Sequence, residues 1–162
     1  MSERPFRRCV RVIITNNKRV LLGKKYINGR FAYYTVPGGG LENGEDIQTT
    51  VLKECMEEVG IRVKNIQSLG FQVCIEMELK KNNRAEHFKG SEDNWYTAEY
   101  VGKDTSLHGD DKDSFPYSWE TVDSAIEKIS SEKSSPHTES KLEALKRVKK
   151  HLENKSVGIE AW

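Results

Sequence analysis

The sequence predicts a single α/β domain in which helices cover a mixed β-sheet. Five runs rich in β-branched and aromatic residues are typical of strands: 8–15, 18–26, 31–36, 71–79 and 95–101. One helical segment interrupts these runs, and two more follow them. The chain has 162 residues, 36% of them hydrophobic, which suffices for one core but hardly for two. We therefore take residues 1–162 as one domain whose sheet lies between helices.

The strands are expected in a definite order. The first two runs, 8-RCVRVIIT-15 and 18-KRVLLGKKY-26, are separated by 16-NNK-18, which predicts a hairpin turn. The third run, 31-FAYYTV-36, stops at Pro37, which cannot donate a backbone hydrogen bond. In the fourth run, apolar residues alternate with more polar ones, which predicts one buried strand face: Phe71, Val73, Ile75, Met77 and Leu79. A long polar connection, 80–94, leads to the fifth run.

Three helices are expected. The first covers 47–59. In the second, four apolar residues recur at positions i, i+3, i+4 and i+7: Val122, Ala125, Ile126 and Ile129. After a polar linker the last helix is expected at about 138–154, with Thr138 as its N-cap. Its inner face would carry leucine and valine: Leu142, Leu145, Val148 and Leu152.

Charge and composition exclude several classes of protein. With 26 Lys and Arg against 25 Asp and Glu, the net charge is +1, so no overall field favours nucleic acid or an anionic membrane as a partner. No run of eighteen apolar residues exists, and the N-terminus lacks an apolar signal-peptide core, so we expect a cytoplasmic protein. Cys9, Cys55 and Cys74 are odd in number and widely spaced, which favours reduced, packed thiols over a disulfide or zinc site.

Three glutamates on the first helix need a partner. At 100° per residue, Glu54, Glu57 and Glu58 fall within about 100° of one another. Apolar residues occupy one half of the wheel: Ile47, Val51, Leu52, Cys55, Met56 and Val59. Glu58 lies at the margin of that half, where a lone carboxylate is costly. A proton, a basic side chain or a metal ion could stabilise the charge, and Lys53 alone offsets too little. Hard oxygen ligands suit Mg²⁺ or Mn²⁺, whereas the alternative is a solvated acidic face.

A glycine run precedes this helix. Gly38, Gly39 and Gly40 follow Pro37 and carry no side chains, so their backbone can approach an ion or a phosphate closely. A strand, a glycine loop and an acidic helix in succession predict a cradle for a metal–diphosphate complex.

The spacing of these residues resembles the Nudix box. Its pattern is G-x5-E-x7-R-E-U-x-E-E-x-G-U, where U is aliphatic, and the segment from Gly39 to Ile61 matches it. Six fixed positions agree in type and spacing: Gly39, Glu45, Glu54, Glu57, Glu58 and Gly60. Two positions depart, since Lys53 replaces the arginine and Cys55 replaces an aliphatic residue. Lysine cannot make the forked pairing that arginine makes with a carboxylate.

The resemblance implies a Nudix-type α/β/α sandwich with a mixed sheet, and Mg²⁺- or Mn²⁺-dependent hydrolysis of a nucleoside diphosphate linked to another moiety. By this resemblance Glu57 and Glu58 would be the main metal ligands, Glu54 a further ligand or the base, and the Gly39 carbonyl an additional ligand. Glu45 would support the site near Lys53. Metal ions neutralise bridging phosphates and lower the pKa of a bound water, whose proton a carboxylate removes.

Several further residues are weaker candidates. Glu54 leads as the base, and later acids are alternatives that are more often solvated charges: Glu86, Glu92, Asp110 and Asp111. Lys24 and Lys25 could contact phosphate oxygens or be ordinary strand lysines. Six aromatic residues could stack a base, although most should be core: Tyr33, Tyr34, Trp95, Phe115, Tyr117 and Trp119. The four histidines have no metal-ligand spacing: His87, His108, His137 and His151.

The sequence leaves the substrate open. The position fifteen residues past Gly60 is Ile75, and no proline or tyrosine stands near it, so no extra subfamily signature is found. The lean form fits a nucleoside triphosphate or ADP-sugar pyrophosphatase that acts on a nucleotide-type small molecule, as a monomer or a homodimer. The alternative is a nucleotide-binding sensor or regulator on the same scaffold, which Lys53 favours and the intact glutamates oppose.

Overall fold

A computed structural model describes residues 4–76, 88–103 and 115–160, with the side chains of 155–160 left aside. Its described strands form one mixed sheet in the order β3-β2-β1-β6-β5, and two further strands attach to this path. The strands are β1 (Arg7–Asn16), β2 (Arg19–Ile27), β3 (Arg30–Thr35), β4 (Gly38–Gly40), β5 (Ile61–Glu76), β6 (Gly90–Lys103) and β7 (Tyr117–Thr121). β1 and β6 are parallel, and the other pairs are antiparallel.

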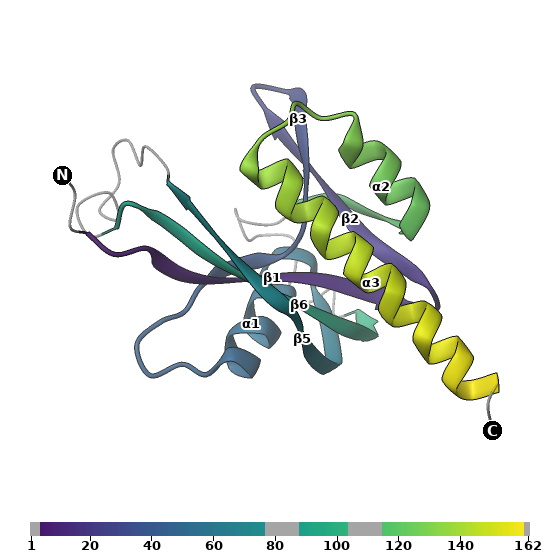
Figure 1. Cartoon of the computed structure of the whole chain (residues 1–162). Coiled ribbons are helices and arrows are strands. Elements are labelled where there is room, and N and C mark those ends of the chain that lie inside the picture. The colour runs from purple at the N-terminus through teal and green to yellow at the C-terminus, as the bar shows by residue number, and fades with distance from the viewer. Residues whose placement is uncertain (1–3, 77–87, 104–114, 161–162) are drawn as a thin grey trace.

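Helices cover both faces of the sheet (Figure 1). On one face, α1 (Ile47–Val59) packs Val51, Cys55 and Val59 against even-numbered residues of β1 such as Val12. On the other face, α2 (Val122–Ser130) and α3 (Pro136–Glu160) pack against odd-numbered residues such as Ile13. The α/β/α sandwich is therefore confirmed. No described helix is long and apolar enough to cross a membrane.

The first helix is confirmed at 47–59 because both ends carry strong signals. The Asp46 side chain accepts a hydrogen bond from the Thr49 N–H, and Gly60 ends the helix in the left-handed conformation with φ 67°. The hairpin turn is also confirmed, with Asn17 and Lys18 both at positive φ, as a two-residue turn between twisted strands requires.

Several boundaries differ from the predicted ones. The fourth predicted strand, expected to begin at Phe71, is part of β5, which begins ten residues earlier at Ile61. The fifth, expected to begin at Trp95, is part of β6, which begins at Gly90. β7 was not predicted. It pairs with β2 but has only five residues, too few for the alternation of apolar and polar side chains to indicate a strand. The last helix begins at Pro136, and its N-cap is Ser135 and not the predicted Thr138. The Ser135 hydroxyl oxygen accepts a hydrogen bond from the Thr138 N–H.

Two predictions of burial were wrong. Leu52 is 45% exposed, because it lies at the outer margin of the α1 stripe. Cys74 is exposed, whereas Cys9 and Cys55 are buried free thiols as expected. Cys74 stands on the outward side of β5, where alternate residues face solvent. Phe71, Val73 and Ile75 do share the inward side, and Met77 and Leu79 lie outside the described residues.

Candidate active site

The three glycines form a short strand, β4, and not the open loop that was predicted. Gly40, Gly39 and Gly38 pair with β1 in antiparallel register, so part of their backbone is engaged in the sheet. They are glycines because the strand is crowded on both faces. A Cβ on Gly39 would overlap the Glu54 carboxylate, and a Cβ on Gly38 would lie 2.8 Å from Cδ of Arg11.

The two faces of β4 carry opposite charges. Gly39 faces α1 and its carboxylates, whereas Gly38 and Gly40 face the side chains of Arg11 and Arg7. Arg7 and Arg11 were not predicted from the sequence, although their odd positions on β1 place them together on the α2–α3 face. The glycine strand is thus a thin partition between an acidic and a basic surface.

Two of the three helix glutamates contact this partition. Glu54 lies against Gly39, and Oε2 of Glu58 accepts a hydrogen bond from the Gly38 N–H at 3.3 Å. Glu57, one turn away, is exposed. Within residues 4–76, 88–103 and 115–160, no three carboxylate, thiol or imidazole side chains converge to enclose a metal ion. Glu54 and Glu58 both lie against β4 and offer hard oxygen donors, so these two carboxylates fit a divalent cation in their chemistry.

The buried Cys55 thiol reports the negative field of these glutamates. Burial raises the pKa of Cys55, and the nearby Glu58 and Glu54 carboxylates raise it further because they disfavour a second anion. Cys55 therefore remains a neutral thiol and fills the aliphatic position of the box as a small apolar residue. The field at this point favours a cation.

Glu45 and Lys53 form the predicted pair. Nζ of Lys53 lies 2.9 Å from Oε2 of Glu45, and the hydroxyl of Thr50 donates to Oε1 of the same carboxylate at 2.8 Å. The hydrogen bond to Lys53, followed by that to Thr50, lowers the pKa of Glu45, and the same contact with Glu45 raises the pKa of Lys53. The pair thus stays charged at neutral pH and fixes the start of α1 to the loop before it.

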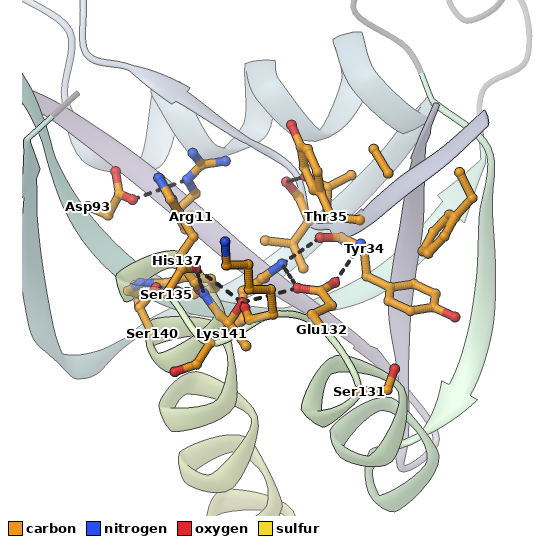
Figure 2. A pocket seen from close by; sticks show the side chains of 18 residues that line it. Arg11, Tyr34, Thr35, Asp93, Ser131, Glu132, Ser135, His137, Ser140 and Lys141 are labelled. Atoms are coloured by element: carbon orange, nitrogen blue, oxygen red, sulfur yellow. Dashed lines mark hydrogen bonds and ion pairs between the residues drawn. The ribbon is translucent and has the colours of Figure 1, made fainter. Parts of the chain in front are cut away.

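A cavity of about 830 Å³ lies on the opposite face of the sheet, between β3 and the connection from α2 to α3 (Figure 2). Its walls combine aromatic side chains with charged ones. The aromatic residues are Phe31, Tyr33, Tyr34 and Trp95, and the charged or titratable ones include Arg11, Asp93, Glu132, His137 and Lys141. Arg11 belongs to both the cavity and the surface of β4, so it joins the cavity to the glycine strand.

A buried ion pair closes the cavity against the edge strand β3. Nζ of Lys141 lies 2.7 Å from Oε1 of Glu132 and donates to the Tyr34 carbonyl at 2.8 Å, while Oε2 of Glu132 accepts from the Tyr34 N–H at 2.7 Å (Figure 2). The two side chains are only 10% and 9% exposed. Burial lowers the pKa of Lys141 even though the hydrogen bond to Glu132 opposes this shift. Both backbone groups of Tyr34 are thereby satisfied without a neighbouring strand.

The opposite wall holds polar atoms that are only partly satisfied. Oδ2 of Asp93 lies 3.6 Å from Nε of Arg11, and Asp93 is almost fully buried. Among the described residues, Oδ1 of Asp93 and Nε1 of Trp95 have no hydrogen-bond partner. His137, to which the sequence analysis assigned no role, lines the cavity, and burial followed by the charge of Arg11 lowers its pKa. Unsatisfied buried polar atoms are uncommon, and the two in Asp93 and Trp95 belong to residues that line the cavity.

The remaining predicted residues are scattered. Lys24 and Lys25 pair in register with Tyr34 and Tyr33 on the outer hairpin, and their contact with phosphate stays a prediction. Glu92 contacts Arg8 and the Asn94 amide. The alternative bases Glu86, Asp110 and Asp111 lie outside the described residues, as do His87 and His108. Most of the six aromatic residues are buried or partly buried in the core as expected, and Tyr33 is 42% exposed.

Comparison with known proteins identifies the family. The family model described as NUDIX domain matches residues 5–141, which cover most of the chain. The chain belongs to the NUDIX domain family. A relative from Dinoroseobacter shibae called RNA pyrophosphohydrolase is 27% identical over 110 residues, covering 64% of this chain and 68% of the relative. An RNA pyrophosphohydrolase from the Wolbachia of Culex pipiens is 24% identical over 135 residues, covering 77% and 80%.

Solved structures support the same fold. A structure described as an ADP compounds hydrolase superimposes with a TM-score of 0.65 at 17% identity, covering 94% of this Nudix chain and 76% of the other. A NUDIX hydrolase from Nitrosomonas europaea gives a TM-score of 0.59 at 18% identity, covering 80% and 81%. At these identities the likeness concerns the fold. The family-model match over residues 5–141 confirms the resemblance of the segment from Gly39 to Ile61 to the Nudix box, and together with the relatives it identifies the chain as a Nudix hydrolase.

Proposed function

We propose that this Nudix hydrolase cleaves a pyrophosphate bond in a nucleoside diphosphate that is linked to another moiety, with Mg²⁺ or Mn²⁺ as cofactor. The observation that carries the proposal is the glycine strand β4. Glu54 and Glu58 lie against one face of this strand and Arg11 lies against the other, and Arg11 also lines the cavity. An acidic surface for a cation and a basic surface beside a cavity are what a metal–diphosphate substrate needs.

Roles are assigned to residues of the box. Glu57 and Glu58 would be the main metal ligands, Glu54 a further ligand or the base, and the Gly39 carbonyl an additional ligand. When bound, the metal would neutralise phosphate charge and lower the pKa of its water. Lys53 and Glu45 hold the start of the helix that presents these carboxylates.

The substrate class includes nucleoside triphosphates, ADP-sugars and triphosphorylated RNA. The first two were predicted because the sequence carries no extra subfamily signature near the Nudix box. The third is added because relatives at 24–27% identity are called RNA pyrophosphohydrolases. The net charge of +1 led us to expect no nucleic-acid partner, but net charge does not describe how charge is distributed over the surface.

A catalytically weak nucleotide sensor is the second candidate. The observation that favours it is the single contact of Lys53 with Glu45 at 2.9 Å, where an arginine would make a forked pair. A sensor would bind nucleotides through the cavity and release no product.

Turnover of a substrate panel tests the proposal. The cleavage products of nucleoside triphosphates, ADP-ribose, ADP-sugars and 5′-triphosphorylated RNA would be separated and measured with Mg²⁺, with Mn²⁺ and with chelator, since an ADP-linked substrate releases AMP and a sugar phosphate whereas the triphosphates release pyrophosphate or phosphate. Metal-dependent turnover is expected from the wild type and at least a hundredfold less from Glu58→Gln. Equal turnover by Glu58→Gln would remove this residue from the site. Nucleotide binding without any turnover would support the sensor.

A further inference from the structure

We propose that the β2–β3 hairpin is a docking surface for single-stranded RNA, which would extend over it from the nucleotide held at the cavity. This inference rests on the proposed function, because it assigns the substrate of the same site to the polynucleotide class. The proposal uses the outer part of the hairpin, Lys24 to Tyr33, which we call the hairpin arm. In Figure 1 the arm is the pair of strands β2 and β3 that extends to the upper edge of the molecule.

The hairpin arm exposes aromatic and aliphatic side chains. Six large hydrophobic residues are exposed in the described part of the chain, and four of them lie on the arm: Tyr26 at 48%, Ile27 at 53%, Phe31 at 45% and Tyr33 at 42%. Exposed aromatic rings gathered on one hairpin mark an interaction surface more often than chance scatter does. Any of the four bases can stack on such rings, so they suit a ligand without a fixed sequence.

The same hairpin carries only positive charge. Between residues 17 and 41 the chain has five of its 26 basic residues and none of its 25 acidic ones. Three of these, Lys24, Lys25 and Arg30, lie on the arm among the aromatic residues, and Lys25 and Arg30 are exposed. Positive side chains interleaved with aromatic rings provide phosphate contacts and stacking platforms together. The nearly neutral total charge conceals this patch because the rest of the chain is net negative.

The arm is continuous with the cavity. Phe31 and Tyr33 line the cavity and are also exposed, so they belong to both surfaces. From Phe31 a ring contact runs inward to Tyr34, with centroids 4.8 Å apart, and another runs outward to Tyr26, at 6.1 Å. If one nucleotide of an RNA were bound in the cavity, the nucleotides next to it in the RNA would therefore lie beside the rings of Phe31 and Tyr26.

A second copy of this chain is the competing occupant. In a symmetric dimer each arm would meet the other or its immediate surroundings, and each arm brings three positive charges and no acid. Like charges across such an interface oppose association. A polyanion such as RNA would attract these positive charges instead of repelling them, so charge complementarity favours RNA over self-association.

Binding without catalysis tests the surface directly. A 3′-labelled RNA hexamer with a 5′-hydroxyl end would be titrated in the absence of metal and followed by fluorescence anisotropy. The test variant is Tyr26→Ala/Arg30→Gln, since neither residue lines the cavity, and the matched control is Val101→Ala/Lys150→Gln, which removes an exposed apolar residue and a charge elsewhere. We expect the test variant to bind about tenfold more weakly and with a lower salt dependence, and the control to bind like the wild type.

Two results would overturn the inference. One is equal binding of the hexamer by the wild type and the test variant. The other is a wild-type dimer that Tyr26→Ala converts to monomer in sedimentation, since the arm would then be a self-interface. Turnover separates the inference from the proposed function. The test variant should raise KM for triphosphorylated RNA about tenfold and leave hydrolysis of a nucleoside triphosphate unchanged. Hexamer binding that depends on the arm, without turnover of any substrate, would refute only the proposed function.

Discussion

The Lys141–Glu132 pair should contribute strongly to stability, and Lys141→Met tests this. Methionine keeps most of the aliphatic length but removes the charge, the hydrogen bond to Glu132 and the one to the Tyr34 carbonyl. Glu132 would be left as a buried carboxylate, since its side chain is 9% exposed. Removing one partner of a buried pair costs about 3–5 kcal/mol. Because desolvation already lowers the pKa of Lys141, we take the lower end, about 3 kcal/mol.

Urea and thermal unfolding measure this loss. About 3 kcal/mol corresponds to a fall in Tm of roughly 6–12 °C for a domain of this size. The exposed Lys146 on the same helix supplies the control, and Lys146→Met should change stability by less than about 0.5 kcal/mol. The double variant Lys141→Met/Glu132→Gln should lose less free energy of unfolding than the sum of the losses in the two single variants, because it leaves no buried charge. A loss under about 0.5 kcal/mol from Lys141→Met, or strict additivity, would refute the reasoning.

Three further predictions concern single residues. Lys53→Arg should raise kcat/KM in the metal-dependent assay, because arginine can grip Glu45 with two donors, and an unchanged or lower value would show that the lysine is adapted to its place. Since the pKa of His137 is lowered on folding, protonation favours the unfolded chain, so stability should fall as pH drops below about 6.5. His137→Asn should flatten that profile in urea titrations, and an unchanged pH dependence in this variant would contradict the assignment. Cys74 alone should react quickly with a thiol reagent in the native protein, and three fast equivalents would contradict the burial of Cys9 and Cys55.

The sequence predicted the elements whose ends carry local signals. The α1 bounds follow from the Asp46 cap and the left-handed Gly60, both of which act within a few residues. The glycines of β4 were misassigned because glycine is common in loops, and only the crowding between Glu54 and Arg11 shows why a strand needs it here. β7 was missed for a related reason, since its pairing with β2 depends on a distant partner.

The approach of two α1 glutamates to the glycine segment was predictable, and the cavity was not. Spacing within α1 places Glu54 and Glu58 near β4, because a helix fixes the relative directions of residues three and four apart. Arg11, Asp93 and Lys141 come from three elements far apart in the sequence, and only the folded chain brings them to one cavity. The approach of Glu45 to Lys53 was predicted, and the contact at 2.9 Å confirms it.

Binding of Mn²⁺ tests the central claim most directly, because it needs no knowledge of the substrate. Free Mn²⁺ would be followed by electron paramagnetic resonance during titration of the wild type, of Glu57→Gln and of Glu58→Gln. Glu143→Gln is the control, because Glu143 lies on α3 and pairs with Arg147. We predict one site in the wild type and in the control, weakened at least tenfold in both α1 variants. Equal Mn²⁺ binding by all four proteins would contradict a metal site built from these glutamates.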